Sequence, residues 1–85
     1  MIVLTLYSRP GCHLCDEMKA LVQRVTSAVP APATIEEIDI SADPTLEARY
    51  GLEIPVLMLQ GKKIAKYRIE EAALMRALAM RQGDA

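Results

Sequence analysis

The N-terminal part of the chain constrains the fold most, because a strand pattern passes directly into a helix pattern. Residues 2–7 (IVLTLY) are mostly apolar and rich in strand-forming residues, which indicates a buried strand. Residues 8–11 (SRPG) then favour a turn. Beyond the turn, apolar side chains recur at helical spacing, at Leu14, Met18, Leu21, Val22, Val25 and Val29. The pattern predicts a strand, a loop and an amphipathic helix, in that order.

The middle of the chain predicts a second strand and a short helix. Residues 30–32 (PAP) end the first helix, because proline lacks the backbone donor and disfavours helix in the residue before it. Residues 34–40 predict a strand nearer the sheet edge than the first. Asp43 is a suitable N-cap for a short helix that ends at Tyr50, and we expect Gly51 to supply a left-handed residue there.

The last third of the chain predicts a hairpin and a final helix. Pro55 opens the apolar run 56–59 (VLML), which is typical of a strand in the middle of a sheet. A turn at 60–62 leads to a strand at 64–67, antiparallel to the previous one. Residues 70–80 then form an amphipathic helix. The expected fold is α/β in the order βαβαββα, with a four-stranded mixed sheet flanked by three helices.

Size and charge limit the classes of function. With 85 residues the chain predicts one domain, over 1–82, and a short tail at 83–85. A net charge of −1 gives no basic surface for nucleic acid or an anionic membrane, so neither partner is expected. The chain has no apolar run near the ~20 residues that cross a bilayer, and its start lacks a signal-peptide pattern. We expect a soluble, cytoplasmic monomer.

Cys12 and Cys15 are the candidate catalytic residues, because the loop places one at the start of the helix and the other about one turn on. Free backbone N–H groups and the positive end of the helix dipole stabilise a thiolate at Cys12. Arg9 and His13 add positive charge nearby, and are the candidate thiolate-stabilising residues. Cys12 is therefore the expected nucleophile and Cys15 the expected resolving thiol.

This pair predicts thiol-disulfide exchange. The Cys12 thiolate attacks a substrate disulfide, and a mixed disulfide forms. Cys15 then attacks the mixed disulfide, which releases reduced substrate and closes the Cys12–Cys15 bridge. In the alternative interpretation the two cysteines are only small apolar core residues, since free cysteine is often buried.

The sequence predicts no metal and no cofactor apart from the redox-active disulfide. Two thiolates and His13 make an incomplete zinc site, and the chain has no second pair of cysteines or histidines. A metal or iron-sulfur carrier stays open as an alternative only if two chains, or an outside ligand such as a glutathione thiol, complete the site. The methionines are interpreted as core residues: Met18, Met58, Met75 and Met80.

Residues 7–15 (YSRPGCHLC) closely resemble the active-site stretch of glutaredoxins. The order of elements resembles the thioredoxin-like fold over nearly the whole chain, and most closely the small bacterial glutaredoxin-like proteins of the DUF836 type. The resemblance implies a cis peptide bond between Ile54 and Pro55, beside the cysteines. It also implies that the exposed backbone of Ile54 pairs with an extended substrate segment, so Ile54 and Pro55 are candidate substrate-binding residues. A thioredoxin-like binding module that holds a partner in this groove without turnover is the second hypothesis.

The chain departs from glutaredoxins before its last helix. Residues 67–71 (YRIEE) stand where glutaredoxins carry a Gly-Gly pair and an aspartate that hold glutathione. Acidic residues there would repel the carboxylates of glutathione, and Arg68 partly compensates as a candidate substrate-binding residue. Leu6 also occupies the strand position where thioredoxins bury an acid. The resemblance thus implies a protein disulfide or a glutathione mixed disulfide as substrate, and glutathione or a reductase as electron donor.

Overall fold

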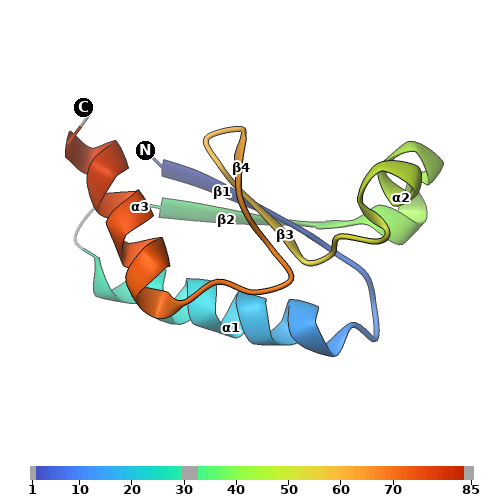
Figure 1. The fold of residues 1–85 in the computed structure, drawn as a ribbon, viewed down its shortest axis with the longest axis horizontal. Helices are drawn as coiled ribbons and strands as arrows, with labels where there is room; N and C mark the ends of the chain where they lie inside the picture. Colours follow the sequence, from blue (N-terminus) through green and yellow to red (C-terminus); the bar gives the residue numbers. More distant parts are fainter. Residues whose placement is uncertain (1, 30–32, 84–85) are drawn as a thin grey trace.

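The computed structural model of the protein describes residues 2–29 and 33–83, and it has the predicted order of elements (Figure 1). The elements are β1 (Ile2–Ser8), α1 (His13–Ala28), β2 (Ala33–Asp39), a 3-10 turn (Ile40–Ala42), α2 (Pro44–Tyr50), β3 (Val56–Leu59), β4 (Lys62–Lys66) and α3 (Glu71–Gly83). The predicted helix end at 30–32 and the last two residues of the tail lie outside the described residues.

The four strands form one mixed sheet in the order β2-β1-β3-β4. β1 runs parallel to β2, with Leu6 opposite Glu37, and antiparallel to β3, with Tyr7 opposite Val56. β3 and β4 form the predicted antiparallel hairpin. The α/β class, the edge position of the second strand and the central position of the third are therefore confirmed.

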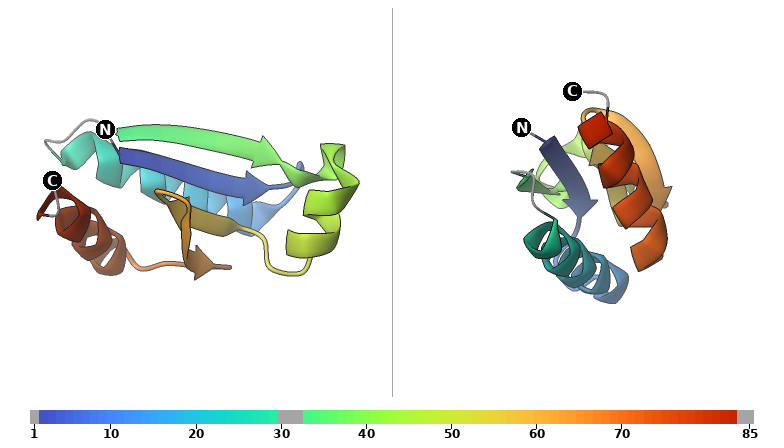
Figure 2. Two further views of the ribbon diagram at one scale, coloured as in Figure 1. Left: turned by 90° about the horizontal axis from the view of Figure 1, so that it is seen from above. Right: turned by 90° about the vertical axis from the view of Figure 1, so that its left-hand side faces the viewer.

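Alternating side chains of the sheet enter two separate cores. One core joins the sheet to α1 and α3, and its fully buried members are Leu4, Leu6, Val22, Leu57, Leu74 and Leu78. The second is smaller and joins the other face to α2 through Ile40, Tyr50 and Val56. Figures 1 and 2 show α1 along the sheet with α3 near its C-terminal half, and α2 at the opposite end of the molecule. No described helix is long and apolar enough to cross a membrane.

Two of the four methionines predicted in the core lie at the surface, so that prediction was wrong for them. Met18 is buried and Met58 is half-buried, whereas Met75 and Met80 are 42% and 71% exposed. The reason is the narrow apolar stripe of α3: among its residues 71–80, only Leu74 and, one turn later, Leu78 are fully buried.

The short helix α2 begins as predicted but ends differently. The Asp43 carboxylate accepts hydrogen bonds from the backbone N–H groups of Thr45 and Leu46, which confirms it as the N-cap. Gly51 has φ −55°, a right-handed conformation, so the prediction of a left-handed residue was wrong. A Cβ atom at Gly51 would lie 2.5 Å from the backbone oxygen of Glu47. This position therefore needs glycine for close packing rather than for handedness.

Candidate redox site

The loop 9–11 places Cys12 at the start of α1. Gly11 has φ +81°, a conformation that favours glycine, and it turns the chain out of β1. The Cys12 N–H then donates to the Arg9 carbonyl oxygen at 3.2 Å. Cys12 has the extended backbone of an N-cap residue, φ −87° and ψ 110°. Cys12 thus lies at the junction between the loop and the helix, as the sequence predicts.

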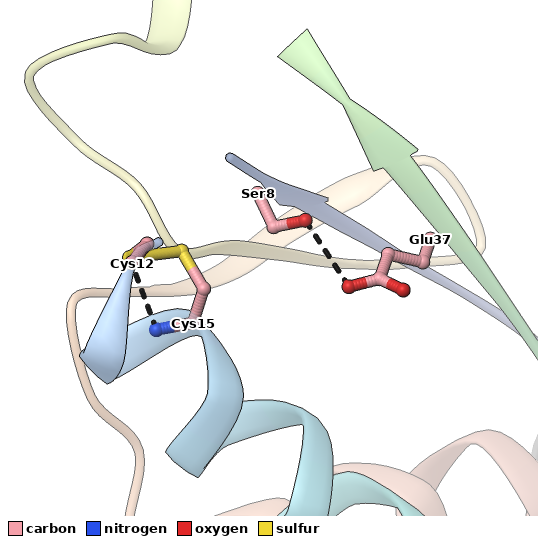
Figure 3. The surroundings of a disulfide bond; sticks show 4 residues. All are labelled: Ser8, Cys12, Cys15 and Glu37. Atoms are coloured by element: carbon pink, nitrogen blue, oxygen red, sulfur yellow. Dashed lines mark hydrogen bonds between the residues drawn. A yellow bond between two sulfur atoms is a disulfide. The ribbon is translucent and has the colours of Figure 1, made fainter. Parts of the chain in front are cut away.

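Cys12 and Cys15 form a disulfide bond, with their Cα atoms 5.2 Å apart (Figure 3). The backbone N–H of Cys15 donates to the Cys12 sulfur at 3.1 Å, so one free N–H of the helix start points at this atom. Cys12 is partly exposed, whereas Cys15 is only 2% exposed. The two sulfurs therefore lie in unequal surroundings, one reachable and solvated, the other buried beneath it.

Arg9 and His13, the predicted charged neighbours of Cys12, precede and follow it in the chain. The Arg9 guanidinium donates to a carboxylate oxygen of Glu47, which joins the loop before Cys12 to α2. The Arg9 Nε and the second Glu47 oxygen are buried without a hydrogen-bond partner. His13 is exposed at the first position of α1. The thiolate-stabilising roles of Arg9 and His13 stay predictions.

The Ile54–Pro55 peptide bond is cis, as the resemblance implies. Pro55 is buried directly before β3, and the register of β3 on β1 places it next to the end of β1, where the Cys12 loop begins. Ile54 is half-buried. The Tyr67 N–H donates to the Pro55 oxygen at 2.8 Å. The structure thus brings Ile54 and Pro55, two of the three predicted substrate-binding residues, to the same end of the sheet as the cysteines.

Tyr67 and Arg68 form the turn between β4 and α3. Tyr67 has φ +67°, and its hydroxyl donates to the Leu52 carbonyl oxygen at 2.7 Å, which fixes the turn against the loop before β3. Arg68 is exposed and lines a hollow of about 180 Å³ between this turn and α1, together with Leu14 and Glu17. The candidate substrate-binding arginine therefore lies across a hollow from the first turns of α1. Its role in binding stays a prediction.

A second hollow, of about 230 Å³, opens beside Cys15. Its lining combines Ser8, Arg9 and Pro10 with Cys15 and Asp16 of α1 and Glu37 and Asp39 of β2. The buried Ser8 hydroxyl donates to Glu37 Oε2 at 3.2 Å (Figure 3), and Lys19 Nζ donates to Glu37 Oε1 at 3.0 Å. Neither Ser8 nor Glu37 is predicted from the sequence. One sequence signal could have identified Ser8. Every second residue of β1 is buried, and Ser8 is the polar residue that follows three apolar ones at these positions.

Asp39 shares this hollow but is tied to its own turn. The Ser41 hydroxyl and backbone N–H both donate to the Asp39 carboxylate, at 2.6 and 2.9 Å. These two hydrogen bonds hold the pKa of Asp39 below its usual value, and the charge of Arg9 adds to the effect. Asp39 therefore stays ionised and is a weak proton acceptor.

The mixed sheet, the cysteine pair at a helix start and the neighbouring cis-proline together define a thioredoxin-like domain. The family described as glutaredoxin-like domain (DUF836) matches residues 3–79, and the chain belongs to this family. A glutaredoxin-like protein of Dictyostelium discoideum is 35% identical over 77 residues, which cover 86% of this chain and 71% of that protein.

Solved structures support the same fold. The X-ray structure of a structural-genomics target from X. campestris is 29% identical, with a TM-score of 0.75, over 91% of this chain and 96% of that one. A thioredoxin mutant from Halobacterium salinarum is 21% identical, with a TM-score of 0.66, over 93% of this chain and 73% of that one. The likeness to this thioredoxin concerns the fold alone.

Proposed function

We propose that the protein is a cytoplasmic thiol-disulfide oxidoreductase in which Cys12 attacks and Cys15 resolves. The observation that carries this proposal is the unequal burial of two bonded sulfurs at a helix start. A partly exposed sulfur can meet a substrate disulfide, while a buried one next to it can only react with its neighbour. Membership of the glutaredoxin-like family supports a redox role.

The reduced protein would act in two displacements. In the first, the Cys12 thiolate attacks one sulfur of the substrate disulfide, and the other substrate sulfur leaves as a thiolate. The Cys15 N–H that points at Cys12 Sγ stabilises negative charge on this atom. In the second, Cys15 attacks Cys12, which expels the remaining substrate thiol and restores the disulfide. Two electrons pass from the protein to the substrate in each cycle.

The substrate is proposed to be a protein disulfide or a glutathione mixed disulfide, and the electron donor glutathione or a reductase. An extended segment of the substrate would pair with the backbone of Ile54, beside Pro55 and Cys12. Arg68 would attract a carboxylate of the substrate. Of the two acids near the start of α3, Glu71 is occupied by an ion pair with Arg24 at 3.0 Å. We propose a monomer that uses no metal, nucleic acid or membrane.

Single cysteine variants test the proposal. Reduction of insulin disulfides by dithiothreitol is followed with wild type, Cys12→Ser, Cys15→Ser and a control, Ser27→Ala, which changes an exposed residue far along the same helix. We expect wild-type activity in the control and loss of turnover in both cysteine variants, with a covalent adduct trapped only in Cys15→Ser. Equal rates in all four proteins, or no adduct, would favour a binding module without turnover.

A further inference from the structure

Cys15 has a proton to lose before it can react. Only the thiolate form of cysteine is a good nucleophile, and the second displacement needs Cys15 in that form. Cys15 is only 2% exposed, and such burial disfavours the charged form of its thiol and limits the access of bulk water to it. A group close to Cys15 that accepts the proton would therefore speed the reaction.

The hollow beside Cys15 provides a route for this proton. Its volume of about 230 Å³ is enough for several water molecules, and its walls carry the polar groups that hold them. Ser8, 5% exposed, projects into this region from the end of β1 and donates to Glu37. Figure 3 shows the Ser8 and Glu37 side chains directed toward one another next to the cysteine pair. The Glu37 side chain is 39% exposed, so it can pass a proton on to solvent.

Glu37 is the best placed of the three carboxylates in the hollow. The Asp39 carboxylate already accepts two hydrogen bonds from Ser41, which lower its pKa and so make it a weaker base, and Asp16 is exposed at the first turn of α1, with no hydrogen bond to Ser8. Glu37 alone is oriented by a buried residue of the hollow. The charged groups that face it are the Lys19 ammonium and Asp16 carboxylate of α1, the Arg9 guanidinium of the loop, and the Asp39 carboxylate of its own strand.

We propose that Glu37 accepts the proton of the Cys15 thiol, through water in this hollow, as Cys15 attacks the mixed disulfide. Ser8 acts as the positioning residue, because its hydroxyl fixes the Glu37 carboxylate. The S–H bond of Cys15 breaks, the Cys15–Cys12 bond forms, and the substrate sulfur leaves with the electron pair of the mixed disulfide. Glu37 then releases its proton to solvent. This inference rests on the proposed function.

A reagent that reports both displacements separately tests the inference. Reduced protein reacts with 5,5′-dithiobis(2-nitrobenzoate), and each displacement releases one coloured thiolate. The first phase reports attack by Cys12, and the second reports attack by Cys15. Stopped-flow absorbance is recorded against pH for wild type, Glu37→Gln, Glu37→Asp, Ser8→Ala and the control Glu36→Gln, an exposed neighbour outside the hollow.

We expect Glu37→Gln to slow the second phase by about 100-fold near neutral pH, in the range usual for loss of a proton acceptor. The deficit should shrink as pH rises, because hydroxide takes over the role. Glu37→Asp should recover part of the rate, Ser8→Ala should slow the second phase less than Glu37→Gln, and the first phase should stay unchanged throughout.

A second phase in Glu37→Gln with the rate and pH profile of wild type would overturn the inference, while the first phase still supported the proposed function. Absence of a first phase in wild type would instead refute the proposed function. A folded Glu37→Gln protein is verified by its circular dichroism spectrum. If it does not fold, Ser8→Ala decides: an unchanged second phase there would also overturn the inference.

Discussion

At the scale of single residues, small differences of position separate the roles of chemically equal groups. Cys12 and Cys15 are both cysteines, yet Cys12 lies at the end of a loop and its sulfur accepts a hydrogen bond from a backbone N–H, whereas Cys15 is buried. The sequence predicts this asymmetry from the spacing of the pair and the start of the helix. It does not predict the Ser8–Glu37 contact, because that contact joins residues 29 positions apart on two neighbouring strands.

The close packing around Gly51 leaves no room for a side chain at this position. In Gly51→Ala, the new Cβ would lie 2.5 Å from the Glu47 oxygen and 3.3 Å from Arg9 Nη2, so the end of α2 must shift. We expect a loss of about 1–3 kcal/mol in the free energy of unfolding, the usual range for a local clash, measured by urea denaturation. Ala48→Ser, at an exposed site in the same helix, is the control. A Gly51→Ala protein as stable as this control would contradict the packing described.

The Asp39 carboxylate gives a prediction about pH. Its pKa is lowered in the folded protein, so its contribution to stability is present above its unfolded pKa of 3.8 and is lost as pH falls through the folded value. Ser41→Ala removes the hydroxyl donor and should move the Asp39 pKa back toward 3.8. An NMR titration of the Asp39 carboxyl carbon measures this, with Ser27→Ala as control. An unchanged Asp39 pKa in Ser41→Ala would disprove the assigned cause.

At the scale of elements, local signals predicted most helices and strands to within a few residues. Prolines, apolar alternation and helical spacing act on neighbouring residues, so the sequence carries them directly. Packing between distant segments was harder to predict. The exposure of Met75 and Met80 depends on how much of α3 the sheet can cover, and the fit of Gly51 depends on the Glu47 oxygen and the Arg9 side chain.

The start of α2 depends on one capping residue. Asp43→Ala removes the acceptor of the Thr45 and Leu46 N–H groups, and should cost about 1 kcal/mol of unfolding free energy. Asp43→Asn keeps an acceptor and should retain most of the stability. Thermal denaturation followed by circular dichroism compares the three proteins. Equal losses in both variants would indicate that the charge of Asp43, not its hydrogen bonds, stabilises α2.

At the scale of the whole molecule, a single sheet supports both stability and the site. The core between the sheet, α1 and α3 fixes the helix that carries the cysteines, while the smaller core packs α2 on the other face of the sheet. The Arg9–Glu47 ion pair joins α2 to the loop that precedes the cysteines. Figure 1 shows this loop and α2 at the same end of the molecule. The order of elements along the chain resembles the thioredoxin-like fold, and the match to the glutaredoxin-like family confirms that fold.

The larger core is expected to dominate stability. Leu78 is fully buried at the contact of α3 with the sheet, so Leu78→Ala should cost about 2–5 kcal/mol, a large part of the stability of a small domain. Met80→Ala changes a largely exposed residue of the same helix and should alter stability by less than about 0.5 kcal/mol. Urea denaturation of both variants decides the matter. Similar losses in the two would mean that α3 does not pack as described.

The central claim, that Cys12 attacks and Cys15 resolves, is tested most directly by mass spectrometry of one turnover. Reduced wild type, Cys15→Ser and Cys12→Ser each react with an equimolar protein disulfide, and proteolytic peptides are then mapped. We expect reduced substrate and an intramolecular Cys12–Cys15 disulfide in wild type, and substrate bound to Cys12 in Cys15→Ser. Unreacted substrate with wild type, or an adduct carried by Cys15 in Cys12→Ser at the rate of wild type, would contradict it.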